Sequence, residues 1–396
     1  MTSRTLQAIA ASLFLAAAVS ASHIPSAPPR LLSETGLYAG RGTNAIDPRN
    51  RPFSPQYPLW SDGAEKSRWV RLPEGATIDV RDVDQWEFPA GTRFWKEFRF
   101  GGRKVETRFL RKNGDGSWTF ASYAWNEAQT DAILAPEDGL PNVAEIAPGK
   151  FHSIPAVIDC RACHEPAAPV VSGFTRIGDA ASRTEILGFS ALQLSSDRDP
   201  GAPHAEPLVD DMVTLATLQD EGLFDPARPE FVTAPPRIPA PDARTRSVLG
   251  YLSTNCGSCH NDDSTIANLG LLLKAKAKAV ASHHWDKEAG TTVGAGTVMG
   301  AGTVVGPDAV VGAGRLRRGF GAQGFSRLLG QPTSKWQIPH VPEGESQYVA
   351  PGAPELSAIL VRMKSRRPST QMPPLGTVLH DKEAIALVTE WIQSLE

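Results

Sequence analysis

The chain of 396 residues lacks the features that mark several classes of protein. Its 40 basic and 43 acidic side chains leave a net charge of −3, and the only dense basic clusters are short ones at residues 315–318 and 364–367. This balance gives no support to a role in binding nucleic acid or an anionic membrane. No serine or carboxylate catalytic constellation, phosphate-binding glycine loop or metalloprotease motif is visible, which disfavours a hydrolase.

Long apolar runs are also scarce, and the longest lies at the start of the chain. Arg4 precedes an apolar run from Ala8 to Val19, and small residues at positions 20 and 21 suit signal peptidase. We interpret residues 1–21 as a signal peptide cleaved near Ala21, and expect a periplasmic protein. The alternative is an N-terminal anchor, but spanning ~30 Å of hydrocarbon takes about 20 apolar residues. No other segment is long enough, so no membrane span is expected in the mature chain.

Cysteine is rare, with four residues in all, and each belongs to one short motif. Residues 160–164 read Cys-Arg-Ala-Cys-His and residues 256–260 read Cys-Gly-Ser-Cys-His. C-x-x-C-H is the attachment motif of c-type haem, because thiols three residues apart on a helical turn can add to both vinyl groups of one porphyrin. The adjacent histidine can then ligate the iron. The sequence therefore predicts two covalently bound haem c groups, attached through Cys160 and Cys163 and through Cys256 and Cys259, with His164 and His260 as proximal ligands.

Three other uses of the cysteines fit the spacing less well. A zinc site built from two C-x-x-C pairs usually has them ~15 to 20 residues apart, whereas Cys163 and Cys256 are far more distant. A thioredoxin-like redox pair uses one motif within a βαβ unit. Disulfides within each pair would close very short loops and stabilise little.

Met372 is the candidate for the second axial ligand of the second haem. It precedes Pro373 and Pro374, and two prolines keep the backbone extended and hold the thioether on a stiff loop. A His/Met ligand pair raises the reduction potential, as electron-transfer cytochromes require. A methionine more often fills a core, and Met363, within a helical pattern from Pro354 to Lys364, fits that role.

The first haem leaves its sixth ligand open. His152, His204 and Met212 are candidates, and His204 leads by a small margin. A five-coordinate iron is a further alternative.

The hydrophobic pattern divides the chain into segments. Residues 46–150 form a β-rich module, in which residues 69–72, 94–100 and 105–110 show near period-two alternation. Residues 104–125 are interpreted as a hairpin, and six of the nine tryptophans lie between residues 60 and 125. We expect a β-sandwich or a similar antiparallel module. Residues 151–241 form a first haem segment and linker. Residues 242–396 hold a helix capped by Asp242, the Met372 loop and an amphipathic helix from Asp381, the parts of a class I cytochrome c domain.

A glycine repeat interrupts this last segment. Glycine recurs every six residues from Gly294 to Gly312, but so few hexads make little more than one coil of a β-helix, so residues 286–318 are interpreted as a surface insertion. The predicted fold class is therefore an α+β multidomain protein: an N-terminal antiparallel β module, a first haem segment, and an all-α cytochrome c-like domain.

These motifs together resemble an incompletely characterised family of exported dihaem c-type cytochromes. The similarity covers about residues 50–395 apart from the insertion, and rests on both haem motifs and the stretches at residues 57–64, 86–92, 105–108, 123–127 and 371–377. The resemblance implies the same cysteine, histidine and Met372 assignments, and implies no substrate.

The leading functional hypothesis is a periplasmic dihaem electron carrier whose β module docks a redox partner or positions the haems. One rival is a dihaem peroxidase-like oxidoreductase with one open haem iron. Another is the cytochrome subunit of a periplasmic dehydrogenase, with the β module as the binding face.

Overall fold

The computed structural model describes residues 27–40, 42–165, 170–171, 174–175, 184–277, 283–286, 291–294, 328–333 and 335–395. The predicted signal peptide and most of the predicted glycine-rich insertion lie outside these residues. Within the described ranges, no helix combines the length and hydrophobicity needed to span a bilayer.

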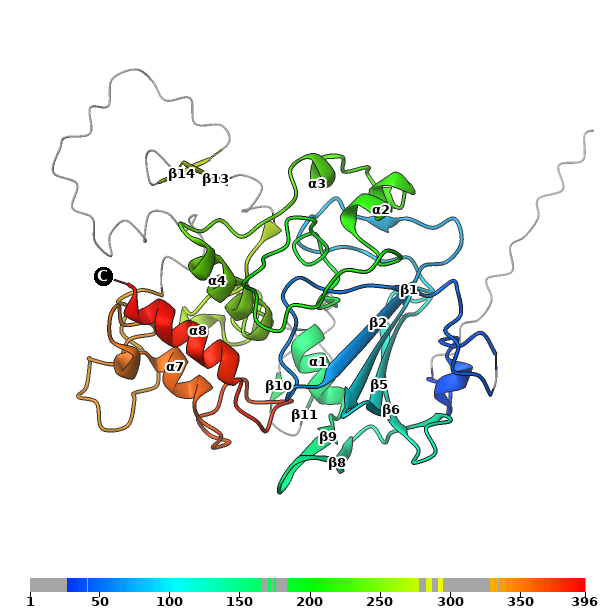
Figure 1. The fold of residues 1–396 in the computed structure, drawn as a ribbon, viewed down its shortest axis with the longest axis horizontal. Helices are drawn as coiled ribbons and strands as arrows, with labels where there is room; N and C mark the ends of the chain where they lie inside the picture. Colours follow the sequence, from blue (N-terminus) through cyan, green and yellow to red (C-terminus); the bar gives the residue numbers. More distant parts are fainter. Residues whose placement is uncertain are drawn as a thin grey trace, which may run out of the picture.

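A six-stranded antiparallel sheet forms the N-terminal part of the molecule (Figure 1). Its spatial order is β1-β2-β4-β5-β6-β7. The strands are β1 (Arg51–Pro52), β2 (Glu65–Arg71), β4 (Arg93–Phe100), β5 (Arg103–Lys112), β6 (Trp118–Trp125) and β7 (Ala132–Leu134). The predicted antiparallel β module is confirmed, as one twisted sheet whose two faces are covered by other segments of the chain.

Side chains alternate between the two faces along each strand, so each face of the sheet has its own hydrophobic core. Trp69, Trp95 and Phe109 lie on one face, which we call the outer face, and pack with the segment around the short 3-10 helix η1 (Leu32–Glu34). The inner face carries Phe94 and Phe120, which pack with residues from the later chain. Successive side chains of a strand point to opposite faces, so aromatic residues at both parities fill both cores.

The predicted hairpin at residues 104–125 is present as β5 and β6. Asn113 closes the turn by accepting from the Gly116 amide at 3.1 Å and donating its own amide to the Ser117 carbonyl at 2.8 Å. Gly116 has a φ of +85°, a conformation that glycine adopts without steric cost.

Shorter elements surround the sheet. The strands form the pairs β3 (Ile78–Asp79) with β12 (Phe224–Asp225), β8 (Leu140–Ala147) with β9 (Lys150–Ile154), β10 (Val170–Val171) with β11 (Phe174–Thr175), and β13 (His283–Asp286) with β14 (Thr291–Gly294). The helices are α1 (Val157–His164), α2 (Leu215–Asp220), α3 (Glu230–Thr233), α4 (Ala243–Asn255), α7 (Ala358–Met363) and α8 (Lys382–Gln393), with 3-10 turns η2 (Ala267–Leu269) and η4 (Pro354–Leu356).

Helices α4, α7 and α8 lie on the opposite side of the molecule from the sheet, with α1 between (Figure 1). Asp242 accepts from the Thr245 amide at 2.9 Å and Asp381 from the Ala384 amide at 3.0 Å. The predicted cap at Asp242 and the predicted start of the last helix at Asp381 are therefore confirmed. Trp391 and Ile392 of α8 are buried against Val248 and Leu252 of α4.

The predicted fold class is wrong in its C-terminal part. No all-α cytochrome c-like domain is present in the described part of residues 242–396, which holds three helices joined by long irregular stretches and isolated bridges such as Leu329–Val349. The β-rich sheet, and not a helical domain, dominates the structure. The physical reason is proline: Pro332, Pro339 and Pro342 lie within one short stretch, and proline cannot continue a helix. The periodicity of the terminal helices therefore does not extend between them.

The sheet and the helices share a core. Tyr57, just before β2, packs with Leu249 of α4 in one buried cluster, and its hydroxyl donates to Asp199 Oδ2 at 3.1 Å. Trp60 donates its amide to Asn255 Oδ1 at 2.8 Å. The segment at residues 57–64 therefore connects the β module to the helix that leads into the second C-x-x-C-H motif.

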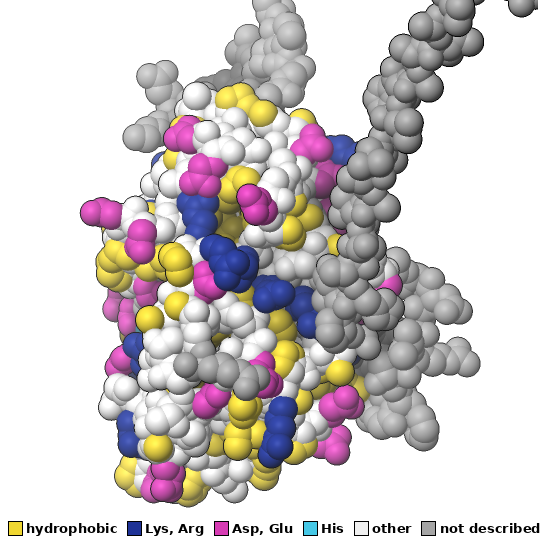
Figure 2. Space-filling view, turned by 90° about the vertical axis from the view of Figure 1, so that its right-hand side faces the viewer, with side chains coloured by type: hydrophobic (Ala, Val, Ile, Leu, Met, Phe, Trp, Pro, Cys, Tyr) yellow, Lys and Arg dark blue, Asp and Glu magenta, His cyan; other side chains and the backbone are white. Residues whose placement is uncertain are grey.

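Arginines also line up on the outer face of the sheet. Arg71, Arg93 and Arg111 are cross-strand neighbours on β2, β4 and β5. Figure 2, turned to the right-hand side of Figure 1, shows Lys and Arg side chains in a band across that side of the molecule.

Candidate functional site

Both C-x-x-C-H motifs line one cavity of about 1070 Å³ between the inner face of the sheet and the C-terminal helices. Its walls include the residues that the sequence singled out for chemistry: Cys160, Cys163, His164, Cys256, Cys259, His260, Met372 and His152. The volume slightly exceeds the ~300 to 1,000 Å³ typical of small-molecule and cofactor sites. The rest of the lining is largely apolar, with aromatic and aliphatic side chains from both halves of the chain. A large planar apolar cofactor fits such a space.

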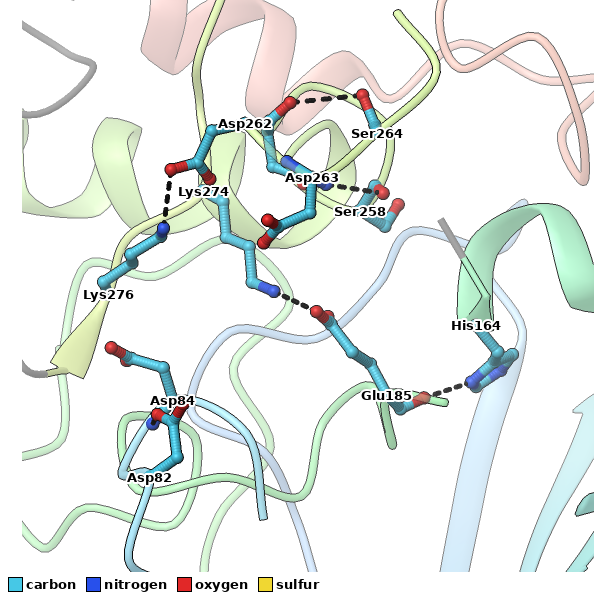
Figure 3. A network of polar contacts seen from close by, with 12 residues as sticks. Asp82, Asp84, His164, Glu185, Ser258, Asp262, Asp263, Ser264, Lys274 and Lys276 are labelled. Carbon is cyan, nitrogen blue, oxygen red and sulfur yellow. Dashed lines mark hydrogen bonds and ion pairs between the residues drawn. The ribbon is translucent and has the colours of Figure 1, made fainter. Parts of the chain in front are cut away.

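The first motif lies on α1, which packs across β6 on the inner face. The rings of His164 and Phe120 have their centroids 5.5 Å apart. His164 Nδ1 donates to the Glu185 carbonyl oxygen at 2.6 Å, which Figure 3 shows. This bond fixes the neutral tautomer and leaves Nε2 with a free lone pair, the state in which histidine ligates a metal. Burial lowers the pKa of His164 to about 4, although the hydrogen bond to the Glu185 carbonyl opposes this shift. The ring is therefore neutral at physiological pH.

The second motif follows directly on α4. The His260 amide donates to the Cys256 carbonyl at 2.8 Å, and the His260 carbonyl accepts from the Leu273 amide at 2.8 Å. Burial, reinforced by Arg362, lowers the pKa of His260 to about 4. Gly257 must be glycine: an added Cβ would lie 2.3 Å from the Ser253 carbonyl oxygen and 2.9 Å from Lys274 Cα. The turn therefore packs tightly against the chain that returns past it.

The two motifs lie against each other, although they are far apart in the sequence. Cys163 and Cys259 both line the cavity, and the neighbouring thiols shift each other's pKa, which is raised for Cys163 and lowered for Cys259. Glu185 links the same two segments, because its carbonyl accepts from His164 while its carboxylate pairs with Lys274 (Figure 3). Groups attached at the two motifs would therefore lie side by side in one cavity.

All four cysteines are free thiols, and none is paired in a disulfide. Burial raises the pKa of Cys160, and raises that of Cys256 to about 12. In the described part of the chain, no three His, Cys, Asp or Glu side chains are arranged to hold a metal ion by themselves.

Met372 lines the same cavity, on a loop anchored at both ends. Its amide donates to the Arg362 carbonyl at 3.1 Å, which ties the loop to the end of α7. Asp62 holds the other end, accepting from the Val378 amide at 3.0 Å and the Leu379 amide at 2.8 Å. Asp62 belongs to the segment that also contacts α4, so one stretch of the β module positions both the second motif and the Met372 loop. Met363 is buried in the C-terminal core and also reaches the cavity.

Of the three candidates for the sixth ligand of the first haem, only His152 lines the cavity. It is buried on β9, and its Nε2 donates to Glu106 Oε2 at 2.9 Å, which leaves Nδ1 as the free nitrogen. His204 has both ring nitrogens engaged, with Asp381 Oδ1 at 2.9 Å and Glu383 Oε2 at 3.3 Å, and it stacks on Trp60. Met212 lies outside the cavity as well. The structure therefore does not place His204 in the cavity with His164, and His152 is the candidate that the geometry favours as sixth ligand.

Several residues of the site were not found from the sequence. Glu185 acts through a backbone carbonyl, which carries no side-chain signature. Asp62 lies in the stretch at residues 57–64, and its role depends on the Met372 loop, which is distant in the sequence. The basic side chains Arg68, Lys96 and Arg108 line the cavity. The sequence pattern does not show which other segments pack on the face of the sheet that carries them.

Comparison with protein-family models, with curated proteins and with solved structures finds no match to this chain. The functional assignment therefore depends on the motifs and the cavity.

Proposed function

We propose that this chain is an exported electron-transfer protein that carries two covalently bound haem c groups in one cavity, and that it belongs to the dihaem c-type cytochromes it resembles. The observation that carries the proposal is the convergence of both C-x-x-C-H motifs on a single apolar cavity. The two motifs are far apart in the sequence, and their common position in one cavity is what two cofactors that exchange electrons require.

The residues present fit the cofactor. Each motif offers two thiols for thioether bonds and one histidine, and haem itself supplies the remaining in-plane ligands of the iron. When bound, haem supplies one-electron chemistry at the iron, and the protein sets its ligation, burial and electrostatics.

The side chains have distinct roles in this proposal. Cys160 and Cys163 would tether one haem, and His164 would hold its iron through Nε2 because Glu185 engages the other ring nitrogen. Cys256 and Cys259 would tether the second haem, and His260 and Met372 would hold its iron. The largely apolar walls of the cavity would favour a high reduction potential for an iron held by a His/Met pair.

The two motifs line one cavity, and Glu185 connects their segments, because its carbonyl accepts from His164 and its carboxylate pairs with Lys274. The residues of both motifs would therefore hold the two haems close together. Bound haems at this separation would supply electron transfer within the chain, with a periplasmic redox partner as donor or acceptor.

A second candidate function is peroxide reduction at the first haem. The observation that favours it is the buried pair of His152 and Glu106, which Arg108 completes through a 2.8 Å contact between its Nε and Glu106 Oε1. A buried histidine held by a carboxylate can move a proton at a ligand on an open iron. If His152 is instead the sixth ligand of the first haem, that iron would have no open position for peroxide, and the protein would act as an electron carrier.

A redox titration with electronic and electron paramagnetic resonance spectra tests the proposal. The expected result for the exported holoprotein is two one-electron steps and two low-spin ferric irons in the oxidised state. A high-spin first haem that reacts rapidly with peroxide and cyanide supports the second candidate. Absence of any haem signal refutes both.

A further inference from the structure

Three basic side chains form a cross-strand row on the inner face of the sheet. Arg68 of β2 is paired in register with Lys96 of β4, and Lys96 with Arg108 of β5. All three line the cavity that holds both C-x-x-C-H motifs. Like charges directly opposite on neighbouring strands are destabilising, so this row is costly in the absence of compensating anions.

The two outer members of the row have carboxylate partners. Arg68 forms a two-pronged pair with Glu206, at 3.1 Å between Nη2 and Oε1 on one prong. Arg108 contacts Glu106, with its Nη2 at 3.2 Å from Oε2. Lys96, in the middle, has no carboxylate within ion-pair distance among the described residues, and its Nζ lies 4.8 Å from the centroid of the Phe98 ring.

Lys66 adds a further positive charge to the same face, two residues before Arg68. Its Nζ donates to the Leu59 carbonyl at 3.0 Å and has no carboxylate partner among the described residues. Of these four cations, Arg68 and Arg108 have carboxylate partners, whereas Lys66 and Lys96 form no ion pair within the described part of the chain. A buried charge without a partner is costly, and a bound dianion would compensate it.

We propose that the row Arg68–Lys96–Arg108, with Lys96 as its central contact, binds the two propionate carboxylates of the haem attached at Cys160 and Cys163. This inference rests on the proposed function. The first haem is the one concerned because the row is close to its motif. Arg108 is paired in register with Ser122 of β6, and Phe120 of the same strand has its ring centroid 5.5 Å from that of His164. Burial, aided by Arg68 and Lys66, lowers the pKa of Lys96 well below its usual range, and a carboxylate placed beside the ammonium group would raise that pKa again.

The row also affects the iron. A positive charge near a haem favours the reduced state, because reduction lowers the charge of the iron by one. A unit charge at ~10 Å in an effective dielectric of ~20 changes the reduction equilibrium constant by about tenfold, which is about 59 mV for a one-electron couple.

The test is the redox titration of the exported holoprotein carrying Lys96→Met. We expect one haem to lose about tenfold in its reduction equilibrium constant while the other is unchanged. Lys96→Arg keeps the charge and should keep the parent potential. Lys96→Gln, which retains a polar end at the same position, should lower the potential as Lys96→Met does, and provides a second neutral variant if the first does not fold.

Lys104→Met is the matched control, because Lys104 lies on β5 at the outer face, 4.2 Å from the Trp125 ring centroid. It should leave both potentials unchanged. Two loaded haems with unaltered potentials in both neutral Lys96 variants would overturn the propionate assignment and leave the proposed function intact, whereas a parent protein without haem would overturn the proposed function itself. A potential that follows the concentration of added acetate in the parent, but not in Lys96→Met, would also overturn the assignment and show that the row binds a diffusible carboxylate.

Discussion

Gly250 of α4 faces the ring of Tyr57, and a Cβ added at this position would lie 2.0 Å from Cε1 and 2.4 Å from Cδ1 and Cζ. The Gly250→Ala substitution therefore forces a methyl group into the contact between the β module and the helix that leads to the second motif. Tyr57 has little room to move, since it is 2% exposed and its hydroxyl is bonded to Asp199.

Two opposing effects set the magnitude. Alanine stabilises a helix interior by roughly 0.5 to 1 kcal/mol relative to glycine. Overpacking a core costs about 1 to 3 kcal/mol, and the rigid ring places this site at the upper end. We expect Gly250→Ala to lower the free energy of unfolding by about 2 kcal/mol, or Tm by ~4 to 8 °C for a cooperative unit of about 150 to 250 residues.

Urea unfolding followed by tryptophan fluorescence measures the effect. In the Tyr57→Ala background the clash is gone, so Gly250→Ala should raise the free energy of unfolding by roughly 0.5 to 1 kcal/mol, the helix-propensity gain alone. Gly114→Ala is the control, because nothing lies within 4 Å of its added Cβ. A Gly250→Ala variant as stable as the parent, or the same cost in both backgrounds, would refute the packing of Tyr57 on α4.

Three further outcomes are expected. Met372→Ala should lower the potential of the His260 haem and open its iron to cyanide, and an unchanged titration would remove Met372 from the site. Gly257→Ala should reduce the haem count from two to one, because its Cβ meets backbone atoms on two sides; mass spectrometry that still finds two haems would contradict this. Burial would raise the pKa of Glu106, but Arg108 and the neighbouring histidine outweigh it and lower the pKa to about 2. The stabilisation from ionised Glu106, on the order of 3 kcal/mol, is therefore complete above its unfolded pKa near 4.5 and lost as pH falls towards 2. The free energies of unfolding of the parent and of Glu106→Gln, measured from pH 7 to pH 2, test this stabilisation. A difference between the two proteins that does not change with pH would contradict it.

Local patterns of the sequence predicted local structure well. The alternation in residues 104–125 and the turn at Asn113 predicted β5 and β6, and the caps Asp242 and Asp381 predicted where α4 and α8 begin. Each of these signals depends on residues close together in the chain. The prediction of an all-α domain was wrong because the helical patterns of α4 and α8 were taken to continue between them. The described part of the proline-rich stretch around Pro332 to Pro342 contains no helix.

Contacts between distant segments could not be predicted in the same way. The sequence left His152, His204 and Met212 open as sixth ligands, with His204 leading by a small margin, and only the fold shows that His204 is held by Asp381, the N-cap of α8. The register that pairs Arg68, Lys96 and Arg108 depends on how three strands align, which alternation within each strand does not determine.

The intact mass of the exported protein, matured in a cell that attaches haem c and purified under denaturing conditions, tests the central claim most directly. Two thioether-bound porphyrins should stay with the unfolded polypeptide and raise its mass by two haem groups, and the variant with Cys256 and Cys259 both changed to alanine should carry one. A colourless protein with the mass of the bare polypeptide would contradict the account.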